Sequence, residues 1–161
     1  MGLRYDYYSI INEFNESNIS PKIALLYQFN NKISMRGLLA QAYRNPSMAE
    51  RFIKFEQGGG LKFQPNPDLQ SEKLDVSLEL GSKIKVNEWL SFDFALFYNH
   101  YNNLISFQQI SNSGEALLYK VINLKASVMQ GVEGQINFRN IRGLVLYGGY
   151  SFLDARVVSD N

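Results

Sequence analysis

Apolar and polar residues alternate through the middle of this chain, from residue 73 to residue 86. The even positions are mostly aliphatic, namely Leu74, Val76, Leu78, Leu80, Ile84 and Val86. The odd positions are charged or small, namely Lys73, Asp75, Ser77, Glu79, Gly81, Lys83 and Lys85. Successive side chains of a strand point to opposite faces, so the pattern predicts a strand with one apolar face and one polar face. The strand is longer than the usual 5–6 residues and reaches the roughly 9–11 residues that cross a bilayer, which is typical of a transmembrane β-barrel.

Similar strand-like segments recur along the whole chain, so the sequence predicts an all-β, antiparallel up-and-down meander of about seven long strands. The predicted strands cover residues 3–9, 21–29, 32–43, 74–86, 90–105, 118–138 and 144–155. Short turns are predicted at Asn30, Asn87 and Asn140, and long loops at residues 10–20, 44–70 and 106–117. Short connections at one end and long ones at the other are the asymmetry of outer-membrane barrels.

Composition narrows the class of protein. A net charge of +1 over 161 residues gives no electrostatic case for binding nucleic acid. The sequence contains no run of about 18 apolar residues, so no transmembrane helix is predicted. The 10 Tyr and 11 Phe fit the aromatic girdles of a membrane barrel or an aromatic-rich soluble sheet, and 0 Cys excludes a disulfide framework. The first residues enter a strand without a signal peptide, so we expect a fragment of a longer protein.

Four groups of residues follow one another in an order that resembles a known family. They are Gly2-Leu3-Arg4-Tyr5-Asp6 with Ser20-Pro21-Lys22, Tyr43-Arg44-Asn45-Pro46-Ser47-Met48-Ala49-Glu50, Asn66-Pro67-Asp68-Leu69-Gln70-Ser71-Glu72-Lys73, and Phe97-Tyr98-Asn99 with Leu104-Ile105, Asn123 and Gly131-Val132-Glu133. Their order and spacing resemble the barrel of TonB-dependent outer-membrane receptors over nearly the whole chain. Departures from the family pattern are Tyr43 in place of Phe, Arg51 in place of an apolar residue and Ser71 in place of Pro.

The resemblance implies a partial receptor barrel over residues 1–161, part of a 22-stranded barrel, without the plug and without the C-terminal strand. It implies a fragment of a receptor for energy-coupled uptake of a scarce nutrient of the ferric siderophore, haem or cobalamin class. The implied location is the bacterial outer membrane. The implied partners are outer-membrane lipid, a small-molecule nutrient or metal chelate, and TonB only through the missing N-terminal plug region. No cofactor, metal or nucleic acid is expected.

The extracellular loops and the upper barrel wall form the ligand site in this family, so the resemblance directs attention to the long connection after residue 43. The candidate ligand-binding residues there and on the next strands are Arg44, Glu50, Arg51, Phe52, Phe55, Phe63 and Phe107. Three glycines, Gly58 to Gly60, predict a loop tip whose flanking Phe55 and Phe63 close over a ligand. A flexible surface loop without a ligand is the alternative interpretation.

Charged residues at alternating positions are expected to face the lumen and, in a complete receptor, the plug. The candidates are Arg4, Asp6, Asp75, Glu79, Asp93 and Glu133, with Lys73, Lys83, Lys85 and Arg139 on the same face. They either hold and release the plug through ion pairs or line a solvated lumen without a specific partner.

The sequence gives no indication of an enzyme. His100 is the only histidine, and no nucleophile or orienting acid stands at a recognisable spacing from it. A complete, small eight-stranded outer-membrane protein with a structural or adhesion role is the main alternative. A soluble β-sandwich or lipocalin-like binder is a third hypothesis.

Overall fold

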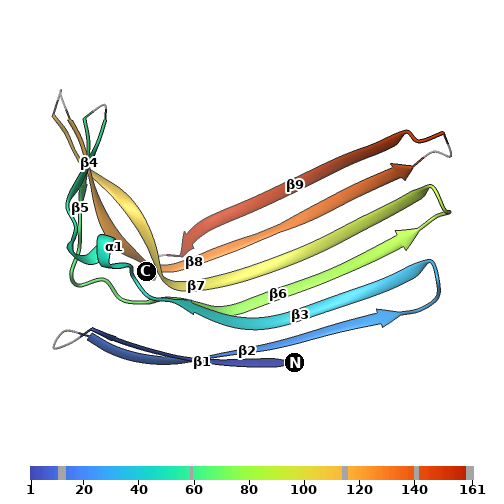
Figure 1. Cartoon of the computed structure of the whole chain (residues 1–161), viewed down its shortest axis with the longest axis horizontal. Coiled ribbons are helices and arrows are strands. Elements are labelled where there is room, and N and C mark those ends of the chain that lie inside the picture. The colour runs from blue at the N-terminus through green and yellow to red at the C-terminus, as the bar shows by residue number, and fades with distance from the viewer. Residues whose placement is uncertain (11–13, 59, 114–115, 140–141, 159–161) are drawn as a thin grey trace.

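The computed structural model describes residues 1–10, 14–58, 60–113, 116–139 and 142–158, and these form one sheet of nine strands with a single short helix. The long strands are β1 (Gly2–Ile10), β2 (Phe14–Gln28), β3 (Ile33–Arg44), β6 (Glu72–Lys85), β7 (Leu90–Ser113), β8 (Ala116–Arg139) and β9 (Val145–Val158). Each is antiparallel to its neighbour in this order, so the predicted meander is confirmed. Figure 1 shows the long strands side by side as a curved, open sheet.

The sheet is open along both sides. In the described part of the chain, β1 pairs only with β2, and β9 pairs only with β8. The arrangement therefore differs from a closed eight-stranded barrel.

Asparagine side chains form two of the predicted short turns. The Asn30 side-chain oxygen accepts hydrogen bonds from the backbone N–H groups of Lys32 and Ile33, at 2.8 and 2.9 Å. The Asn87 oxygen likewise accepts from Trp89 and Leu90, at 3.1 and 2.8 Å. Asparagine side chains favour turns through such local bonds. The third predicted turn, at Asn140, lies outside the described residues.

One face of the sheet is apolar and the other is polar, as the alternation predicts. A cross-strand row on the apolar face consists of Gly37, Leu80, Leu96, Val132 and Phe152. The neighbouring row on the polar face consists of Arg36, Gly81, Ala95, Glu133 and Ser151. The apolar face has no second layer over it among the described residues, and Leu80 and Phe152 are 52% and 53% exposed.

Two predicted loops are wrong because the strands continue through them. Strand β2 begins at Phe14, within the predicted loop at residues 10–20, and Ser17 pairs with Tyr7. Strands β7 and β8 likewise occupy the described part of residues 106–117 and pair almost to their ends. Backbone ladders need no apolar side chains, so a strand that is solvated on both faces loses the alternation by which it is recognised.

The third predicted loop, residues 44–70, corresponds to the connection between β3 and β6 at residues 45–71, which contains structure of its own. It holds helix α1 (Met48–Phe52) and the short strands β4 (Phe55–Gln57) and β5 (Leu61–Gln64). Strand β4 pairs with β5, and β5 runs parallel to β8 beside residues 117–120. We call residues 45–71 the rim connection.

Within the ranges that the structure describes, no helix has the length and apolar composition needed to cross a membrane.

Candidate functional site

The rim connection begins with a capped helix. Ser47 is the N-cap of α1, and its side chain accepts a hydrogen bond from the backbone N–H of Glu50 at 3.2 Å. The Glu50 carboxylate accepts in return from the backbone N–H of Ser47 at 2.6 Å. This reciprocal capping box satisfies two backbone donors that a helix N-terminus leaves open, and it stabilises a helix of only five residues.

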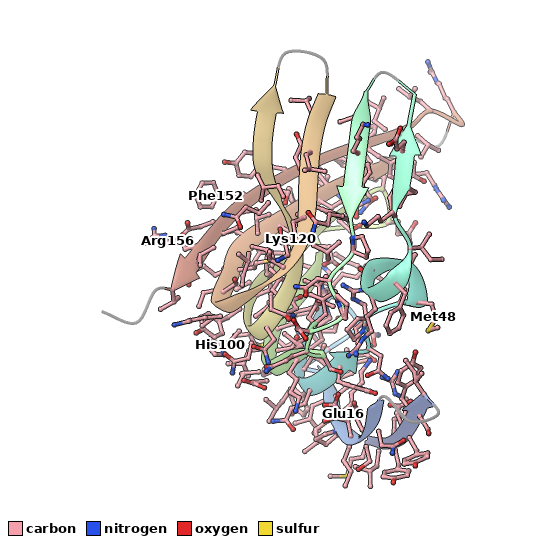
Figure 2. All side chains as sticks on the ribbon, turned by 90° about the vertical axis from the view of Figure 1, so that its left-hand side faces the viewer. Glu16, Met48, His100, Lys120, Phe152 and Arg156 are labelled. Carbon is pink, nitrogen blue, oxygen red and sulfur yellow. The ribbon has the colours of Figure 1, made fainter. Side chains whose placement is uncertain are left out.

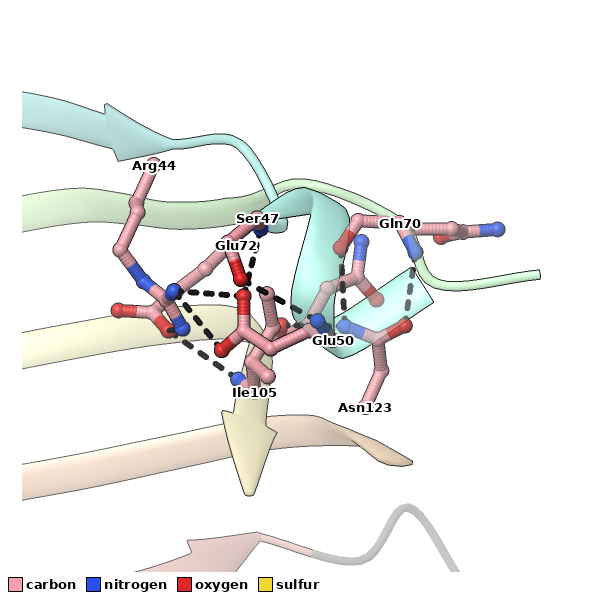
Figure 3. Close-up of polar contacts among 8 residues, drawn as sticks. Arg44, Ser47, Glu50, Gln70, Glu72, Ile105 and Asn123 are labelled. Atoms are coloured by element: carbon pink, nitrogen blue, oxygen red, sulfur yellow. Dashed lines mark hydrogen bonds and ion pairs between the residues drawn. The ribbon is translucent and has the colours of Figure 1, made fainter. Parts of the chain in front are cut away.

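Arg44 joins this helix to the next long strand. Its guanidinium lies 3.1 Å from the Glu50 carboxylate and 3.2 Å from the Glu72 carboxylate. Glu72 also accepts a hydrogen bond from the backbone N–H of Ile105 at 3.1 Å. Figure 3 shows these contacts converging from the end of β3, from α1 and from the start of β6.

Burial alone would raise the pKa of Glu50. Hydrogen bonds from Ser47 and Arg44, together with the positive charge of Arg44, outweigh burial and lower the pKa of this carboxyl below its ordinary value. The carboxylate is therefore held in its charged form.

Asn123 attaches the far end of the rim connection to β8. Its side-chain oxygen accepts from the backbone N–H of Gln70 at 2.8 Å, and its amide donates to the Gln70 carbonyl at 3.0 Å (Figure 3). The Asn66 amide donates to the carbonyl of Val121, two residues before Asn123 on β8, at 3.0 Å. The rim connection thus continues along β8 after the β5 pairing ends.

Arg51, a predicted ligand-binding residue, points into the rim connection. Its side chain is buried, and its guanidinium donates to the carbonyls of Pro67 and Leu69 at 3.3 and 2.6 Å. Leu69 and Val121 are each only 2% exposed and form the small apolar core of this region. The structure gives Arg51 the role of closing the rim connection on itself.

Aromatic rings gather where β5 meets β8. Phe63 stacks on Phe55 with ring centres 4.4 Å apart, and it meets the edge of Phe107 at 5.5 Å. The ring of Tyr119, paired with Phe63 across the parallel ladder, lies 5.9 Å away. Phe55 and Phe107 remain 43% and 52% exposed. We call these four residues the aromatic cluster.

The structure brings together only some of the predicted ligand-site residues. Phe55, Phe63 and Phe107 share the aromatic cluster, while Arg44 and Glu50 form an ion pair with each other. Phe52 ends helix α1 at 37% exposure, without a ring contact among the described residues. Gly60 adopts a left-handed φ of +80° at the tip of the β4–β5 hairpin, which explains a glycine there; Gly59 lies outside the described residues.

Tyr119, Glu72 and Asn123 are functional candidates that the sequence pattern alone does not single out. Glu72 and Asn123 stand within the motifs quoted for the family. Tyr119 becomes visible only through the parallel pairing of β5 with β8. No local periodicity predicts that pairing, because the two segments are more than 50 residues apart in the sequence.

The polar face carries an ion-pair network at mid-strand. Arg36 lies 2.9 Å from Glu79 and 2.8 Å from Asp93. Gly81 leaves room for this side chain, since a Cβ there would lie 2.6 Å from the Arg36 guanidinium carbon. Glu133, one strand further, forms no ion pair among the described residues. Glu79, Asp93 and Glu133 thus lie together on the polar face, and their orientation toward a lumen stays a prediction.

Three other residues predicted for this face make different contacts. Arg4 and Asp6 pair with each other at 2.7 Å on β1. Asp75 lies at a β-bulge between Leu74 and Val76, and its carboxylate contacts Asn102 and, at 3.8 Å, His100.

His100 and Asn102 share the even positions of β7 with Leu96, so Asp75 is on the apolar side of the sheet. The prediction that Asp75 lies on the same face as Glu79 is wrong, because the extra residue of the bulge reverses the alternation. In Figure 2, the labelled His100, Phe152 and Arg156 lie on one side of the sheet, and Met48 of α1 lies on the other.

No group of three or more acidic, histidine or cysteine side chains suited to a metal ion occurs in the ranges that the structure describes.

Residues 1–161 match the model of a protein family described as "TonB dependent receptor-like, beta-barrel". The chain belongs to this family. The match covers all the strands, the rim connection and the aromatic cluster, so the resemblance found in the sequence motifs is confirmed.

Among curated proteins, the chain is 23% identical to the heme/hemopexin utilization protein C of Haemophilus influenzae, over 96% of this chain and 24% of that protein. Among solved structures, it is similar to the siderophore receptor PirA of Pseudomonas aeruginosa, with a TM-score of 0.68 and 20% identity over 89% of this chain and 29% of the other. The ferric enterobactin receptor PfeA of Pseudomonas aeruginosa in complex with enterobactin gives a TM-score of 0.62 and 21% identity, over 85% and 22%. The chain thus spans about a quarter of the length of these relatives.

Proposed function

We propose that this chain is a section of the wall of a bacterial outer-membrane receptor that takes up an iron chelate of the siderophore or haem class with energy from TonB. The observation that carries the proposal is the match of the receptor barrel family to residues 1–161. Cobalamin, which the sequence resemblance also allowed, is less favoured because the relatives named above are siderophore and haem proteins.

The open sheet fits a position in such a wall. Its apolar face would contact outer-membrane lipid, and its polar face would line the interior of the barrel. The short turns then lie at the periplasmic end, and the rim connection lies at the extracellular end. The strands are long enough for this role, since β6 alone has 14 residues.

The aromatic cluster supports a planar, aromatic ligand. Phe63 pairs with Tyr119 on β8, and Tyr119 pairs with Gln109 on β7. The odd positions of these two long strands form the polar face, so the rings would face the mouth of the barrel. Exposed rings of Phe55 and Phe107 offer stacking surfaces to a catecholate or a porphyrin. Both chelates share this flat aromatic chemistry. The rim ion pairs of Arg44 would hold the connection that carries Phe55 and Phe63.

The mid-strand charges support contact with a plug. Glu79, Asp93 and Glu133 surround a single Arg36 on the polar face, which leaves an excess of negative charge toward the interior. A cationic group of a plug domain would complement this excess.

A growth experiment tests the uptake proposal. The gene product that contains this chain is expressed in a strain unable to import chelated iron, with either a ferric catecholate or haem as the only iron source. Growth on only one of the two sources identifies the class of ligand. Replacement of Phe63 and Phe107 by Ala should lower uptake from that source about 10-fold, since each lost aromatic contact contributes about 0.5–1.5 kcal/mol. A Phe29→Ala variant, at a short turn far from the rim, is the matched control. Growth on neither source, with the protein present in the outer membrane, would contradict the proposal.

A further inference from the structure

The end of β7 and the start of β8 form a two-stranded ribbon that extends beyond the rest of the sheet. Strand β6 pairs with β7 only as far as Asn102, and the β7–β8 ladder then continues from Leu104 to the end of β7. The β8 side of this ribbon is covered by β5 and then by Asn66 and Gln70. On the other side, no strand among the described residues pairs with β7 beyond Asn102. Figure 2 shows β7 at one margin of this four-stranded end and β4 at the other.

Backbone groups on the uncovered side of β7 point away from β8. In an antiparallel ladder, opposite residues alternate between pairs that exchange both backbone hydrogen bonds and pairs that exchange none. The Ile105 N–H donates to the Glu72 carboxylate at 3.1 Å, so Ile105 belongs to a pair that exchanges none. The carbonyl of Val121, opposite Phe107, likewise accepts from the rim connection, at 3.0 Å. The N–H and carbonyl groups of Phe107 and Gln109 are therefore directed away from β8.

We call this uncovered stretch, residues 105–109, the open edge. Natural proteins protect such edges with charged side chains, proline or a covering segment, because an unpaired edge readily pairs with another extended chain. Residues 104–113 contain no charged residue, no proline and no glycine, and the first interruption is the bulge between Gln109 and Ser111. The outward backbone groups recur about every 6.5 Å along the strand. An extended polypeptide has donors and acceptors at this spacing, whereas a small chelate does not.

The side chains beside the open edge favour a partner with an apolar or aromatic residue. Phe107 is 52% exposed and belongs to the aromatic cluster. A strand added to the open edge would place every second side chain on the same face as Phe107. The other side of the ribbon already has this arrangement, since β5 adds to β8 and brings Phe63 against Phe107 and Tyr119. The chain itself thus shows which kind of segment the ribbon accepts.

We propose that the open edge binds an extended segment of a second protein, which adds to β7 as a further strand and places an apolar side chain beside Phe107. Backbone hydrogen bonds supply most of the affinity in this mode of recognition, and the alternate side chains supply the specificity. The inference goes beyond the proposed function, because its ligand is a polypeptide and not an iron chelate, and it does not depend on the orientation of the sheet in a membrane.

Peptide binding to the complete gene product that contains this chain tests the proposal. The probe is a capped peptide with the sequence of residues 60–65, which include β5, and the readout is residue-resolved hydrogen exchange. Without peptide, the amides of Phe107 and Gln109 should exchange rapidly, while the amide of Gln108, which faces β8, should exchange slowly. Saturating peptide should slow the exchange of Phe107 and Gln109 about 10-fold and leave Gln108 unchanged.

A proline in the open edge separates backbone recognition from attraction to the aromatic rings. Gln109→Pro removes an outward N–H and no bond to β8, a position at which edge strands tolerate proline. The peptide should bind this variant about 10-fold more weakly, and slow exchange of Gln108 should show that the ladder is intact. Gln109→Ala keeps the N–H, so it is the matched control and should bind as the unmodified protein does. If the proline disrupts the ladder, the exchange of Phe107 and Gln109 in the unmodified protein decides.

Three results would overturn the proposal. The first is slow exchange of Phe107 and Gln109 without peptide in dilute protein, which would mean that another segment of the same molecule covers the edge. The second is protection that appears only as the protein concentration rises, which would identify a second copy as the partner. The third is equal peptide binding by an intact Gln109→Pro variant. Failure of the growth experiment would leave these measurements unaffected, so the two proposals can fail separately.

Discussion

The long strands and the rim connection are held together in different ways. The strands are joined by regular ladders, and their apolar side chains point outward with exposures such as 72% for Leu25 and 44% for Leu96. The rim connection has the buried Leu69, beside the buried Val121 of β8, and is held by polar bonds from its own Arg51, from Arg44 of β3 and from Asn123 of β8. The apolar face of the sheet thus depends on its surroundings for apolar contact, whereas the rim connection is held by contacts within the chain.

The largest difference is expected when a leucine is shortened in each region. Leu69→Ala removes a buried side chain, and such changes cost about 2–5 kcal/mol. We expect that loss in the opening free energy of the rim connection, measured by hydrogen exchange of its backbone amides. Leu25→Ala on the apolar face is the matched control and should leave the exchange of the rim connection unchanged. Equal losses for both variants would mean that the two regions are not distinct.

A charge placed on the apolar face tests the sheet instead of the rim connection. Leu96→Arg should destabilise the membrane-inserted protein by about 2–4 kcal/mol, because the side chain lies mid-strand where a lipid environment excludes charge. Denaturant titration of the protein in lipid vesicles measures the effect. Ser91→Arg on the polar face of the same strand should cost far less. A small loss for Leu96→Arg would show that this face does not meet lipid.

Asn123 tests the attachment of the rim connection to β8. Asn123→Ala removes the side-chain partner of the backbone N–H and carbonyl of Gln70, and because both hydrogen bonds are exposed the loss is about 0.5–1.5 kcal/mol for each. We expect faster hydrogen exchange near Gln70 and weaker ligand uptake, with the strands unaffected. Gln109→Ala on β7 serves as control, and slow exchange retained in Asn123→Ala would argue against the attachment.

The smallest effect concerns the capping box and its dependence on pH. The pKa of Glu50 is lowered in the fold, so its contribution to the stability of α1 is fully present above the ordinary glutamate value of about 4.3 and is lost as pH falls through the lowered value. Ser47→Ala should remove about 0.5–2 kcal/mol at neutral pH and should flatten this acid dependence. Hydrogen exchange at Ile53 as a function of pH measures both. An unchanged acid dependence in Ser47→Ala would contradict the role of the capping box.

The two regions also differ in how far the sequence predicts them. The alternation from residue 73 to residue 86 predicts the strands and their faces, because a strand with one apolar and one polar face has a period of two. It fails at Asp75, where one bulged residue reverses the pattern, and at the strand ends, where water lies on both sides. Ser47 followed by Glu50 is a readable sign of helix α1. The short strands β4 and β5 carry no period, and their aromatic partner Tyr119 follows only from a long-range pairing.

Accessibility along β7 tests the central claim most directly, namely that the sheet separates lipid from the interior of a barrel. The chain has 0 Cys, so single cysteines can be placed at each position from 91 to 98 and labelled with a nitroxide in vesicles. We predict that labels at positions 92, 94, 96 and 98 collide with oxygen dissolved in the lipid and that labels at 91, 93, 95 and 97 do not. A uniform accessibility along these positions, or lipid contact at the odd ones, would contradict the account.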